Sequence, residues 1–385
     1  MTRSVAFVAT GPQFGSIHQY AARFASALSN VYSTSVLTHG VREDVRPDTA
    51  LVKSGYNQTE HGHGFSRFLR MHQEYRQLVR DALNRFDIVH LCSQRLAFLA
   101  KDPSRIILTV HDIFPFGFER GMQDLWRAYN RDPFARMRHL YFRKGLRQAA
   151  KRGIITLADS RFTKRNLECE IGYPSSLVHV IPFPLEKVLG GGIPDRAAAR
   201  SALSIPISSK VLLSISSDEP RKNMPTLYRV LNRLEDDVQV IRVGPIDWSK
   251  LEPRRRLKVR LYQDVPNETL HILYAASDLL LLPSRAEGFG APLAEAMSYG
   301  VPIVGSNAET IREVTANLAL SCDPMDVEGM ISNIHRVFHD PRFASAIAKR
   351  ERDHAVSYHV DSIAQQLVKI YDGLCPLRGK EVKNY

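Results

Sequence analysis

Two glutamates eight positions apart, Glu287 and Glu295, flank residues that could bind a phosphorylated and hydroxylated ligand. Gly288 and Gly290 lie between them, and Pro292 stands near the start of a predicted helix. Glycines let a ligand approach the backbone, and a helix start offers amides and a positive dipole end to an anion. A phosphate could lie there, with one carboxylate on either side to accept hydroxyl hydrogen bonds. The alternative is an ordinary strand-to-helix turn, with Glu287 favouring the dipole and Glu295 solvated.

Arg221 and Lys222 form a second candidate group, because they precede a predicted helix start at Pro225. Two cations at this place could bind a diphosphate and stabilise charge that grows on a departing nucleoside diphosphate. The alternative is an adjacent pair of surface cations with no ligand. His111, which ends a predicted strand before Asp112, could be a general base, a hydrogen-bond partner or a structural cap.

Gly15 and Ser16 follow the first predicted strand and precede an apolar helix face. The segment has no Gly-x-Gly-x-x-Gly pattern, so it does not predict a dinucleotide cofactor. Ser16 could instead cap the helix.

The elements that must position these residues are short apolar strands that alternate with helical patterns. The predicted strands lie at 4–10, 33–38, 87–92, 105–110, 153–158, 177–183, 210–216, 238–244, 278–284, 301–306 and 318–322. Continuously apolar, β-branched strands of this kind are typical of parallel sheets covered on both faces. Because 385 residues exceed what one core usually organises, we predict two doubly wound α/β domains. A glycine triplet within 189–196 places their boundary near residue 190.

The composition is that of an ordinary globular protein, with 44% apolar and 24% charged residues. The four cysteines, Cys92, Cys169, Cys322 and Cys375, form no Cys-x-x-Cys pair, which argues against a disulfide framework or a thiolate metal site. A reducing cytoplasm fits this pattern best. The sequence shows neither a secretory signal nor a stretch of membrane-span length.

The net charge of +12 is concentrated in the first half of the chain. Residues 1–190 carry 27 Lys and Arg against 16 Asp and Glu, whereas residues 191–385 carry 25 against 24. The densest stretch is 126–152, with nine basic residues, one acid and interleaved aromatics. It predicts either a solvated helix with a buried aromatic stripe or a surface for an anionic membrane or an acidic acceptor, and it favours nucleic acid least.

Several of these segments together resemble one enzyme family. Residues 287–304 resemble the Glu-x7-Glu signature of the GT-B retaining glycosyltransferases of family 4. The Glu-Pro-Arg-Lys-Asn segment at 219–223 is similar to the diphosphate-binding segment of a subgroup that includes mannosyltransferases. Many members place the arginine directly after the strand, where this chain has Ser216, and many carry two glycines where this chain has Gly15 and Ser16. The resemblance covers nearly the whole chain and is strongest over 211–315.

The resemblance implies a GT-B fold, with two Rossmann-like domains facing across a cleft. Residues 1–190 would form the acceptor-binding domain and residues 191–360 the donor-binding domain. Residues 361–385 would form a C-terminal helix that packs back towards the N-terminal domain.

The resemblance also implies the reaction, which is hexosyl transfer with retention at the anomeric carbon. The donor would be a GDP- or UDP-linked sugar, with the 219–223 segment favouring GDP-mannose, and the acceptor a glycan or a lipid-linked hydroxyl. The reaction would occur on one face of the sugar, without a cofactor or a metal, and the chain has no Asp-x-Asp triplet. Such an enzyme would serve polysaccharide or glycolipid biosynthesis in the cytoplasm or at the inner face of the membrane.

The resemblance assigns roles residue by residue. The catalytic residues would be Glu287, Lys222, Arg221 and His111, with Glu287 and His111 on the donor sugar and the two cations on the diphosphate. Glu295 would hold the ribose. The other donor-binding residues would be Gly288, Phe289, Gly290, Ala291, Pro292, Leu293, Gly15 and Ser16.

Two other classes of protein remain open from the sequence. A sugar-nucleotide epimerase or a phosphorylase could use a similar two-domain scaffold without an acceptor glycan. A non-catalytic protein that binds nucleotide sugars is the other alternative.

Overall fold

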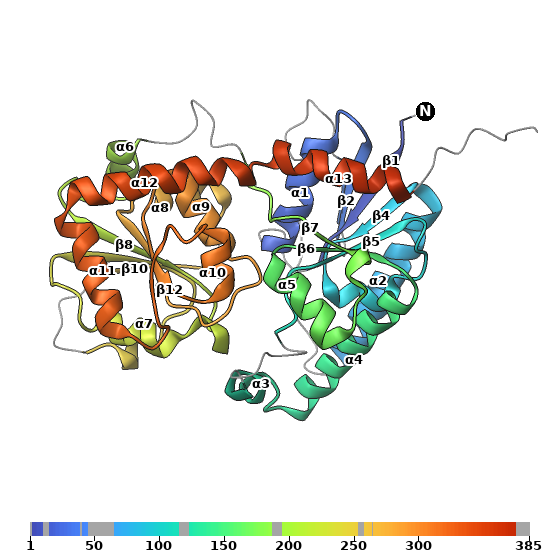
Figure 1. The fold of residues 1–385 in the computed structure, drawn as a ribbon, viewed down its shortest axis with the longest axis horizontal. Coiled ribbons are helices and arrows are strands. Elements are labelled where there is room, and N and C mark those ends of the chain that lie inside the picture. The colour runs from blue at the N-terminus through green and yellow to red at the C-terminus, as the bar shows by residue number, and fades with distance from the viewer. Residues whose placement is uncertain are drawn as a thin grey trace, which may run out of the picture. The chain divides into compact units, whose positions relative to one another are not determined.

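The structure, a computed structural model, describes residues 2–10, 15–38, 41–44, 65–114, 123–186, 195–252, 258–263 and 265–374, with the backbone alone for 41–44 and 65–71. Its internal contacts divide the chain into two compact units. Unit 1 comprises Met1–Pro184 with Val360–Tyr385, and unit 2 comprises Leu185–His359. Each unit is a sheet covered by helices (Figure 1). Residues 189–194 of the expected glycine-rich linker lie outside the described residues.

The sheet of unit 1 has seven strands. In sheet order they are β3 (Val41–Asp44), β2 (Ser33–Thr38), β1 (Ser4–Val8), β4 (Ile88–Leu91), β5 (Ile106–Val110), β6 (Ile155–Ala158) and β7 (Val178–Val180). All neighbouring strands are parallel except β3, which runs antiparallel to β2 at the edge. The strand order reverses between β1 and β4, so the topological switch point of unit 1 lies there.

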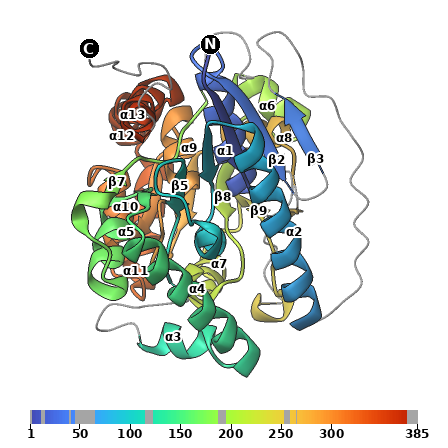
Figure 2. The same ribbon diagram turned by 90° about the vertical axis from the view of Figure 1, so that its right-hand side faces the viewer.

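Two helix layers cover this sheet because successive strand residues face opposite sides. The helices are α1 (Ser16–Leu28), α2 (Phe65–Arg85), α3 (Gln123–Tyr129), α4 (Pro133–Lys151), α5 (Arg161–Asn166) and α13 (Val360–Leu374). Ala6 and Val8 belong to the apolar cluster that includes Phe142 of α4. Phe7, which lies between them, instead contacts the ring of His90, with a centroid distance of 5.2 Å. Figure 2 shows α2 and α4 in front of the strands.

The C-terminal helix α13 belongs to unit 1, where it packs on α1. Tyr371 of α13 is fully buried and its hydroxyl lies 2.7 Å from Nδ1 of His90 in β4. The other ring nitrogen of His90 lies 2.6 Å from the hydroxyl of Thr109, which in turn contacts Tyr20 of α1 at 3.0 Å. Burial, with a smaller contribution from His111, lowers the pKa of His90 to about 3, so this ring is neutral.

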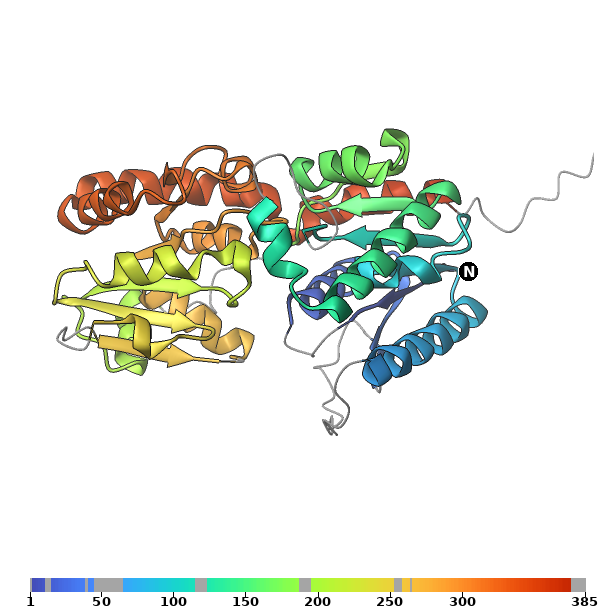
Figure 3. The same ribbon diagram turned by 90° about the horizontal axis from the view of Figure 1, so that it is seen from below.

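The sheet of unit 2 has six parallel strands. In sheet order they are β10 (Lys258–Tyr262), β9 (Val238–Val243), β8 (Lys210–Ile215), β11 (Leu279–Leu282), β12 (Ile303–Ser306) and β13 (Leu320–Cys322). The helices are α6 (Arg196–Ala202), α7 (Met224–Leu231), α8 (Asn267–Ala276), α9 (Ala291–Tyr299), α10 (Glu309–Val314), α11 (Val327–His339) and α12 (Pro341–Ala355). Helices α7 and α11 share one apolar cluster with β8, β9, β11 and β12. Figure 3 shows the strands of this sheet with helices above and below them.

Each of the eleven predicted strands contains a strand of the structure. The predicted fold class, with two doubly wound α/β sheets, is therefore confirmed. Two further strands, β3 and β10, were not predicted. β10 is an edge strand in which Lys258, Arg260 and Tyr262 alternate with apolar residues, so a search for continuous apolar runs misses it. Among the described residues no helix has the length and apolar content needed to cross a membrane.

Candidate active site

The switch point of unit 2 lies between β8 and β11, which are adjacent and parallel. One loop follows β8 and leads to α7, and the other follows β11 and leads to α9. Ligands of open α/β sheets bind at this point, outside the carboxyl ends of the strands. Arg221 and Lys222 lie on the first loop and Glu287 on the second, so the topology joins side chains more than 60 residues apart in sequence.

Asn223 holds the two loops together. Its backbone is left-handed, with φ of 58°, a conformation that asparagine adopts more readily than most residues. Its side-chain amide donates to the carbonyl oxygens of Pro283 at 3.0 Å and Pro324 at 2.7 Å. The backbone amide of Arg285 also donates to the carbonyl oxygen of Arg221 at 2.7 Å. The two loops therefore form one structure rather than two independent turns.

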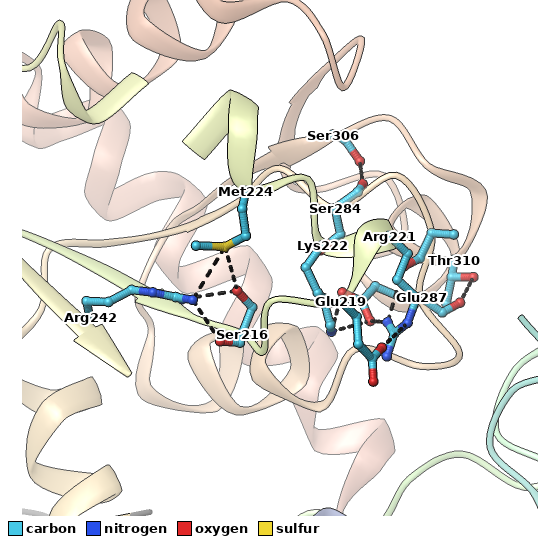
Figure 4. Close-up of polar contacts among 11 residues, drawn as sticks. Ser216, Glu219, Arg221, Lys222, Met224, Arg242, Ser284, Glu287, Ser306 and Thr310 are labelled. Carbon is cyan, nitrogen blue, oxygen red and sulfur yellow. Dashed lines mark hydrogen bonds and ion pairs between the residues drawn. The ribbon is translucent and has the colours of Figure 1, made fainter. Parts of the chain in front are cut away.

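The structure brings Arg221, Lys222 and Glu287 into direct contact (Figure 4). Nη1 of Arg221 lies 2.6 Å from Oε2 of Glu287. Nζ of Lys222 lies 2.8 Å from both carboxylate oxygens. Arg221 also pairs through Nε with Glu219 at 2.8 Å. Glu287 is only 2% exposed, so these contacts form in a site that is largely shielded from water.

The pKa values show how burial and ion pairing compete in this cluster. Burial alone would raise the pKa of Glu287, but Lys222 and then Arg221 outweigh it and hold the pKa at about 2. Burial lowers the pKa of Lys222 below its ordinary value, although the carboxylate of Glu287 opposes that shift. At neutral pH Glu287 is therefore an ionised carboxylate that can accept hydrogen bonds but cannot donate a proton.

A buried arginine lies beneath the first loop. Arg242 of β9 is 0% exposed, and its guanidinium donates to the carbonyl oxygen of Ser216 at 2.8 Å and to that of Pro245 at 3.1 Å. It also donates to the hydroxyl of Ser214 at 3.2 Å. A further hydrogen bond goes to the hydroxyl of Ser216 at 3.0 Å (Figure 4). Burial lowers the pKa of Arg242 to about 10, so the side chain remains a cation. It contacts Ser216, the position where the resemblance implies an arginine in many family members, and its hydrogen bonds hold the loop after β8.

The second loop enters α9 through Gly290, whose backbone is left-handed with φ of 81°. A Cβ atom there would lie 2.8 Å from Cδ1 of Leu293, so a larger residue would have to displace that side chain. Pro292 has no amide hydrogen, and the amide of Leu293 already donates to the carbonyl oxygen of Gly290 at 2.8 Å. The helix start therefore offers fewer amides than the sequence predicts, with Ala291 and the preceding glycine loop as the main candidates. Gly288 and Phe289 lie on that loop and are buried.

Glu295 is held by a neighbouring helix. The buried Tyr274 of α8 donates its hydroxyl hydrogen bond to Oε2 of Glu295 at 2.8 Å. Tyr274 in turn stacks on Tyr299, with ring centroids 5.4 Å apart. The hydroxyl of Tyr274 thus orients this carboxylate. The alternative in which Glu295 is only solvated does not include this contact.

His111 directly follows β5 in unit 1, as predicted. Its Nδ1 lies 2.6 Å from Oδ2 of Asp159, and its Nε2 lies 3.0 Å from the carbonyl oxygen of Cys92. Both partners are acceptors, so both ring nitrogens must carry hydrogens. Burial opposes this charge, but Asp159 outweighs it and raises the pKa of His111. A doubly protonated ring has no lone pair, which argues against the general-base alternative.

Gly15 and Ser16 stand where the chain enters α1, but the alternative that Ser16 caps this helix is wrong. Gly15 occupies the cap position, no side-chain capping bond forms, and Ser16 is the first residue of the helix. The preceding residues 11–14 of the predicted loop lie outside the described residues.

The basic stretch 126–152 is two helices rather than one. Asp132 accepts a hydrogen bond from the amide of Ala135 at 2.8 Å, and Pro133 begins α4. A capping carboxylate followed by proline is a strong helix start, and this pair separates α3 from α4.

Three supporting residues were missed by the sequence analysis. Arg242 could have been found, because a charged residue inside the apolar run 238–244 is unusual in a buried strand. Asp159 also has a local signal, since it directly follows β6 at the same sheet edge as His111. Tyr274 has no such signal, because its role depends on how α8 packs beside α9.

Comparison with known proteins identifies the family. A model of Glycosyltransferase Family 4 matches residues 17–185, and a model of Glycosyl transferases group 1 matches residues 195–354.

Two curated relatives are mannosyltransferases. The O-antigen chain mannosyltransferase B of Escherichia coli is 26% identical over 288 residues, which cover 69% of this chain and 70% of the relative. The MMP alpha-(1->4)-mannosyltransferase of Mycolicibacterium hassiacum is 25% identical over 307 residues, which cover 74% of this chain and 70% of the relative.

Solved structures share the fold over almost the whole chain. WaaG, a glycosyltransferase involved in lipopolysaccharide biosynthesis, aligns with a TM-score of 0.70 at 18% identity and covers 96% of this chain and 100% of its own. Anabaena HepE in complex with UDP-glucose aligns with a TM-score of 0.67 at 16% identity, with coverages of 96% and 100%. The fold, the two family matches and the mannosyltransferase relatives agree, and the chain belongs to the GT-B glycosyltransferases of family 4.

Proposed function

We propose that this glycosyltransferase moves a hexosyl group from a nucleoside diphosphate sugar to an acceptor hydroxyl with retention at the anomeric carbon. The observation that carries the proposal is the buried cluster of Arg221, Lys222 and Glu287 at the switch point of unit 2. Two cations and one carboxylate at a ligand-binding sheet edge suit a ligand that has both phosphate and hydroxyl groups.

The cations stabilise the leaving group in this proposal. Without a ligand, Arg221 and Lys222 are balanced by Glu219 and Glu287. A diphosphate brings further negative charge, which becomes larger as the bond to the sugar breaks. Lys222 then shares its hydrogens between Glu287 and the phosphate, and the strongest interaction forms in the transition state, where it accelerates the reaction.

Glu287 orients the donor sugar. Oε2 accepts from both cations, whereas Oε1 accepts from Lys222 and not from Arg221. A carboxylate oxygen has capacity for about two hydrogen bonds, so Oε1 can accept one more, from a sugar hydroxyl. Glu295 accepts ribose hydroxyls in the same way, beside the hydroxyl of Tyr274.

The transfer takes place on one face of the sugar. The bond from the anomeric carbon to the diphosphate oxygen breaks, and the acceptor oxygen bonds to that carbon on the same face. The acceptor proton moves to the departing phosphate, which leaves as a nucleoside diphosphate. Glu287 is held by two cations and need not act as a nucleophile. Both ring nitrogens of His111 already contact acceptors, so His111 is not the base in this proposal. No step requires a metal or a cofactor.

The donor is GDP-mannose or a UDP-linked hexose, and the acceptor is a glycan or a lipid-linked sugar. Two curated relatives are mannosyltransferases, which supports the first donor, and HepE was solved with UDP-glucose, which supports the second. Incubation with labelled donors and hydroxyl acceptors tests the reaction. Transfer supports the proposal, an isomerised donor would indicate an epimerase, and saturable binding without turnover would indicate a binding protein.

Unit 1 docks on an anionic membrane at the cytoplasmic face, where a lipid-linked acceptor would lie. Helices α3 and α4 combine the basic residues of 126–152 with exposed apolar side chains, namely Trp126 at 37%, Met137 at 43% and Leu140 at 56% exposure. Basic residues beside exposed aromatic and apolar groups suit the headgroup region of such a membrane. Vesicles of anionic lipid should sediment the protein and neutral vesicles should not, and equal sedimentation would contradict this docking.

A further inference from the structure

A cluster of metal-ligating side chains lies in unit 2 away from the candidate active site. Glu235 precedes β9, and His335 and His339 lie in the last two turns of α11. β9 starts at Val238, so the cluster is at the amino edge of the sheet, whereas Lys222 and Glu287 lie at the carboxyl edge. We propose that Glu235, His335 and His339 bind a divalent transition metal ion such as Zn²⁺.

The spacing of the three side chains fits one ion. Residues four apart on a helix share a face, and the rings of His335 and His339 stack with centroids 4.0 Å apart. Oε1 of Glu235 lies 3.0 Å from Nε2 of His339 and 3.7 Å from Nε2 of His335. Tetrahedral zinc with bonds of about 2.0 to 2.1 Å places its ligand atoms roughly 3.3 Å apart. The observed separations lie on either side of that value, so small side-chain movements would complete the site.

The ligand types also fit. Imidazole nitrogen together with carboxylate oxygen suits zinc, nickel or copper better than magnesium or calcium. Three protein ligands leave a fourth position to water. All three side chains are partly exposed, at 41% for Glu235, 61% for His335 and 42% for His339, so an ion can reach them from solvent.

The cluster already attracts a cation, the ammonium group of Lys210. This group pairs with Glu235 at 2.5 Å, lies 3.2 Å from Nε2 of His339, and pairs with Asp237 at 3.1 Å. A metal ion would take Glu235 and His339 from Lys210 and leave it with Asp237. Lys210 therefore competes with a metal ion for Glu235 and His339, and its removal should tighten metal binding.

The bound ion would join two elements that are distant in sequence. Glu235 lies in the connection between α7 and β9, and the histidines end α11, which packs on α7. The metal would stabilise unit 2 by mass action, because the three ligands come together only in the folded chain.

Titration calorimetry with ZnCl₂ on the EDTA-stripped protein tests the site. We expect one saturable ion per chain and a rise in the melting temperature with zinc. His335→Ala, His339→Ala and Glu235→Gln should each weaken binding at least about tenfold, the scale for loss of a ligand or its support. Lys210→Met should strengthen binding.

Glu328→Gln is the matched control, since Glu328 lies on the same helix, is exposed and is not a ligand. Its zinc affinity should equal that of the unaltered protein. Equal affinities for Glu235→Gln and Glu328→Gln would overturn the three-ligand site, and so would the absence of saturable binding. Circular dichroism of each stripped variant excludes misfolding as the cause, and hexosyl transfer is assayed separately, so the two proposals fail independently.

Discussion

Lys222 is the single side chain that most directly tests the proposed leaving-group stabilisation. Its ammonium group is buried against Glu287, and no other residue of the cluster contacts both oxygens of that carboxylate. Lys222→Ala should keep the fold, because Arg221 still pairs with Glu287. We expect kcat to fall at least about 100-fold, or about 2.7 kcal/mol, the scale for removal of one transition-state donor.

Lys258→Ala is the matched control for this variant, because Lys258 is an exposed lysine of unit 2 on edge strand β10. Its turnover with the donor that supports transfer should be unchanged. Near-normal turnover of Lys222→Ala would exclude the assigned role.

Glu351 gives a second residue-scale prediction, on the pH dependence of stability. It is 0% exposed, Oε1 accepts from the amide of Ile303 at 3.3 Å, and Oε2 has no hydrogen-bond partner among the described residues. Burial raises its pKa from 4.5 to about 8. The stability from the neutral acid is therefore fully present below pH 4.5 and is lost as the pH rises to about 8, at a cost on the order of 5 kcal/mol.

Glu351→Gln removes this titration. Urea unfolding at pH 5 and pH 9 should show that the variant gains stability relative to the native protein at the higher pH. The exposed Glu252→Gln should show no such gain. A constant difference between Glu351→Gln and the native protein at both pH values would contradict the buried neutral acid.

The chemical types of the site residues can be predicted from sequence, but their pairing cannot. Arg221, Lys222 and Glu287 stand after predicted strands, where ligand-binding residues are expected. That Glu287 accepts from both cations depends on how two loops meet, and nothing in either segment encodes the contact. The same holds for Tyr274 and Glu295.

At the scale of elements, Arg242 fixes the loop after β8 to the neighbouring strand. Its guanidinium satisfies the carbonyl oxygens of Ser216 and Pro245 at once. Lysine keeps the charge but cannot span both groups, so Arg242→Lys should lower the free energy of unfolding by about 2 to 3 kcal/mol. Because the loop carries Arg221 and Lys222, we also expect the KM for the donor to rise about tenfold, with a smaller change in kcat.

Arg229→Lys serves as the control, since Arg229 lies exposed on α7. It should change neither urea unfolding nor KM. An Arg242→Lys variant that is destabilised but keeps its donor KM would mean that the arginine supports the core alone and does not position the loop.

Whether a segment is a helix or a strand could be predicted where one hydrophobic pattern dominates it. The first and last residues of each element were harder to predict. The apolar strands of both sheets can be recognised in the sequence as continuous apolar runs, because they are buried on both faces. The edge strand β10 has no such run, because charged and apolar residues alternate in it. The break between α3 and α4 could be predicted only by recognising Asp132 as a helix cap.

At the scale of the whole molecule, the chain leaves unit 1 and later returns to it. The return places α13 in unit 1 and buries Ile363, Leu367 and Tyr371. Truncation after His359 should therefore destabilise unit 1, since each buried side chain contributes about 1.5 to 3 kcal/mol. Differential scanning calorimetry should show an earlier or absent transition for unit 1 and a retained transition for unit 2.

Truncation after Leu374 provides the comparison, because it keeps α13. Tyr371→Phe provides a milder change, removing only the hydroxyl that contacts His90, and should cost about 1 to 2 kcal/mol. Identical calorimetric traces for the two truncations would show that α13 does not stabilise unit 1.

The two-sheet architecture follows from strand and helix periodicity along the chain, and so do the carboxyl-edge positions of the candidate residues. The donor and acceptor do not follow, because they depend on side chains that no short pattern specifies. The further cluster at Glu235, His335 and His339 cannot be found from the sequence for a similar reason, since Glu235 lies about 100 residues before the two histidines.

The stereochemistry of transfer tests the central claim most directly. The protein is incubated with GDP-mannose and UDP-hexoses in the presence of a hydroxyl acceptor, and proton NMR follows the anomeric configuration of the product. We predict release of a nucleoside diphosphate and a glycoside with the same anomeric configuration as the donor, at a rate that Lys222→Ala lowers and Lys258→Ala does not. An inverted product, or an isomerised donor without transfer, would contradict the account.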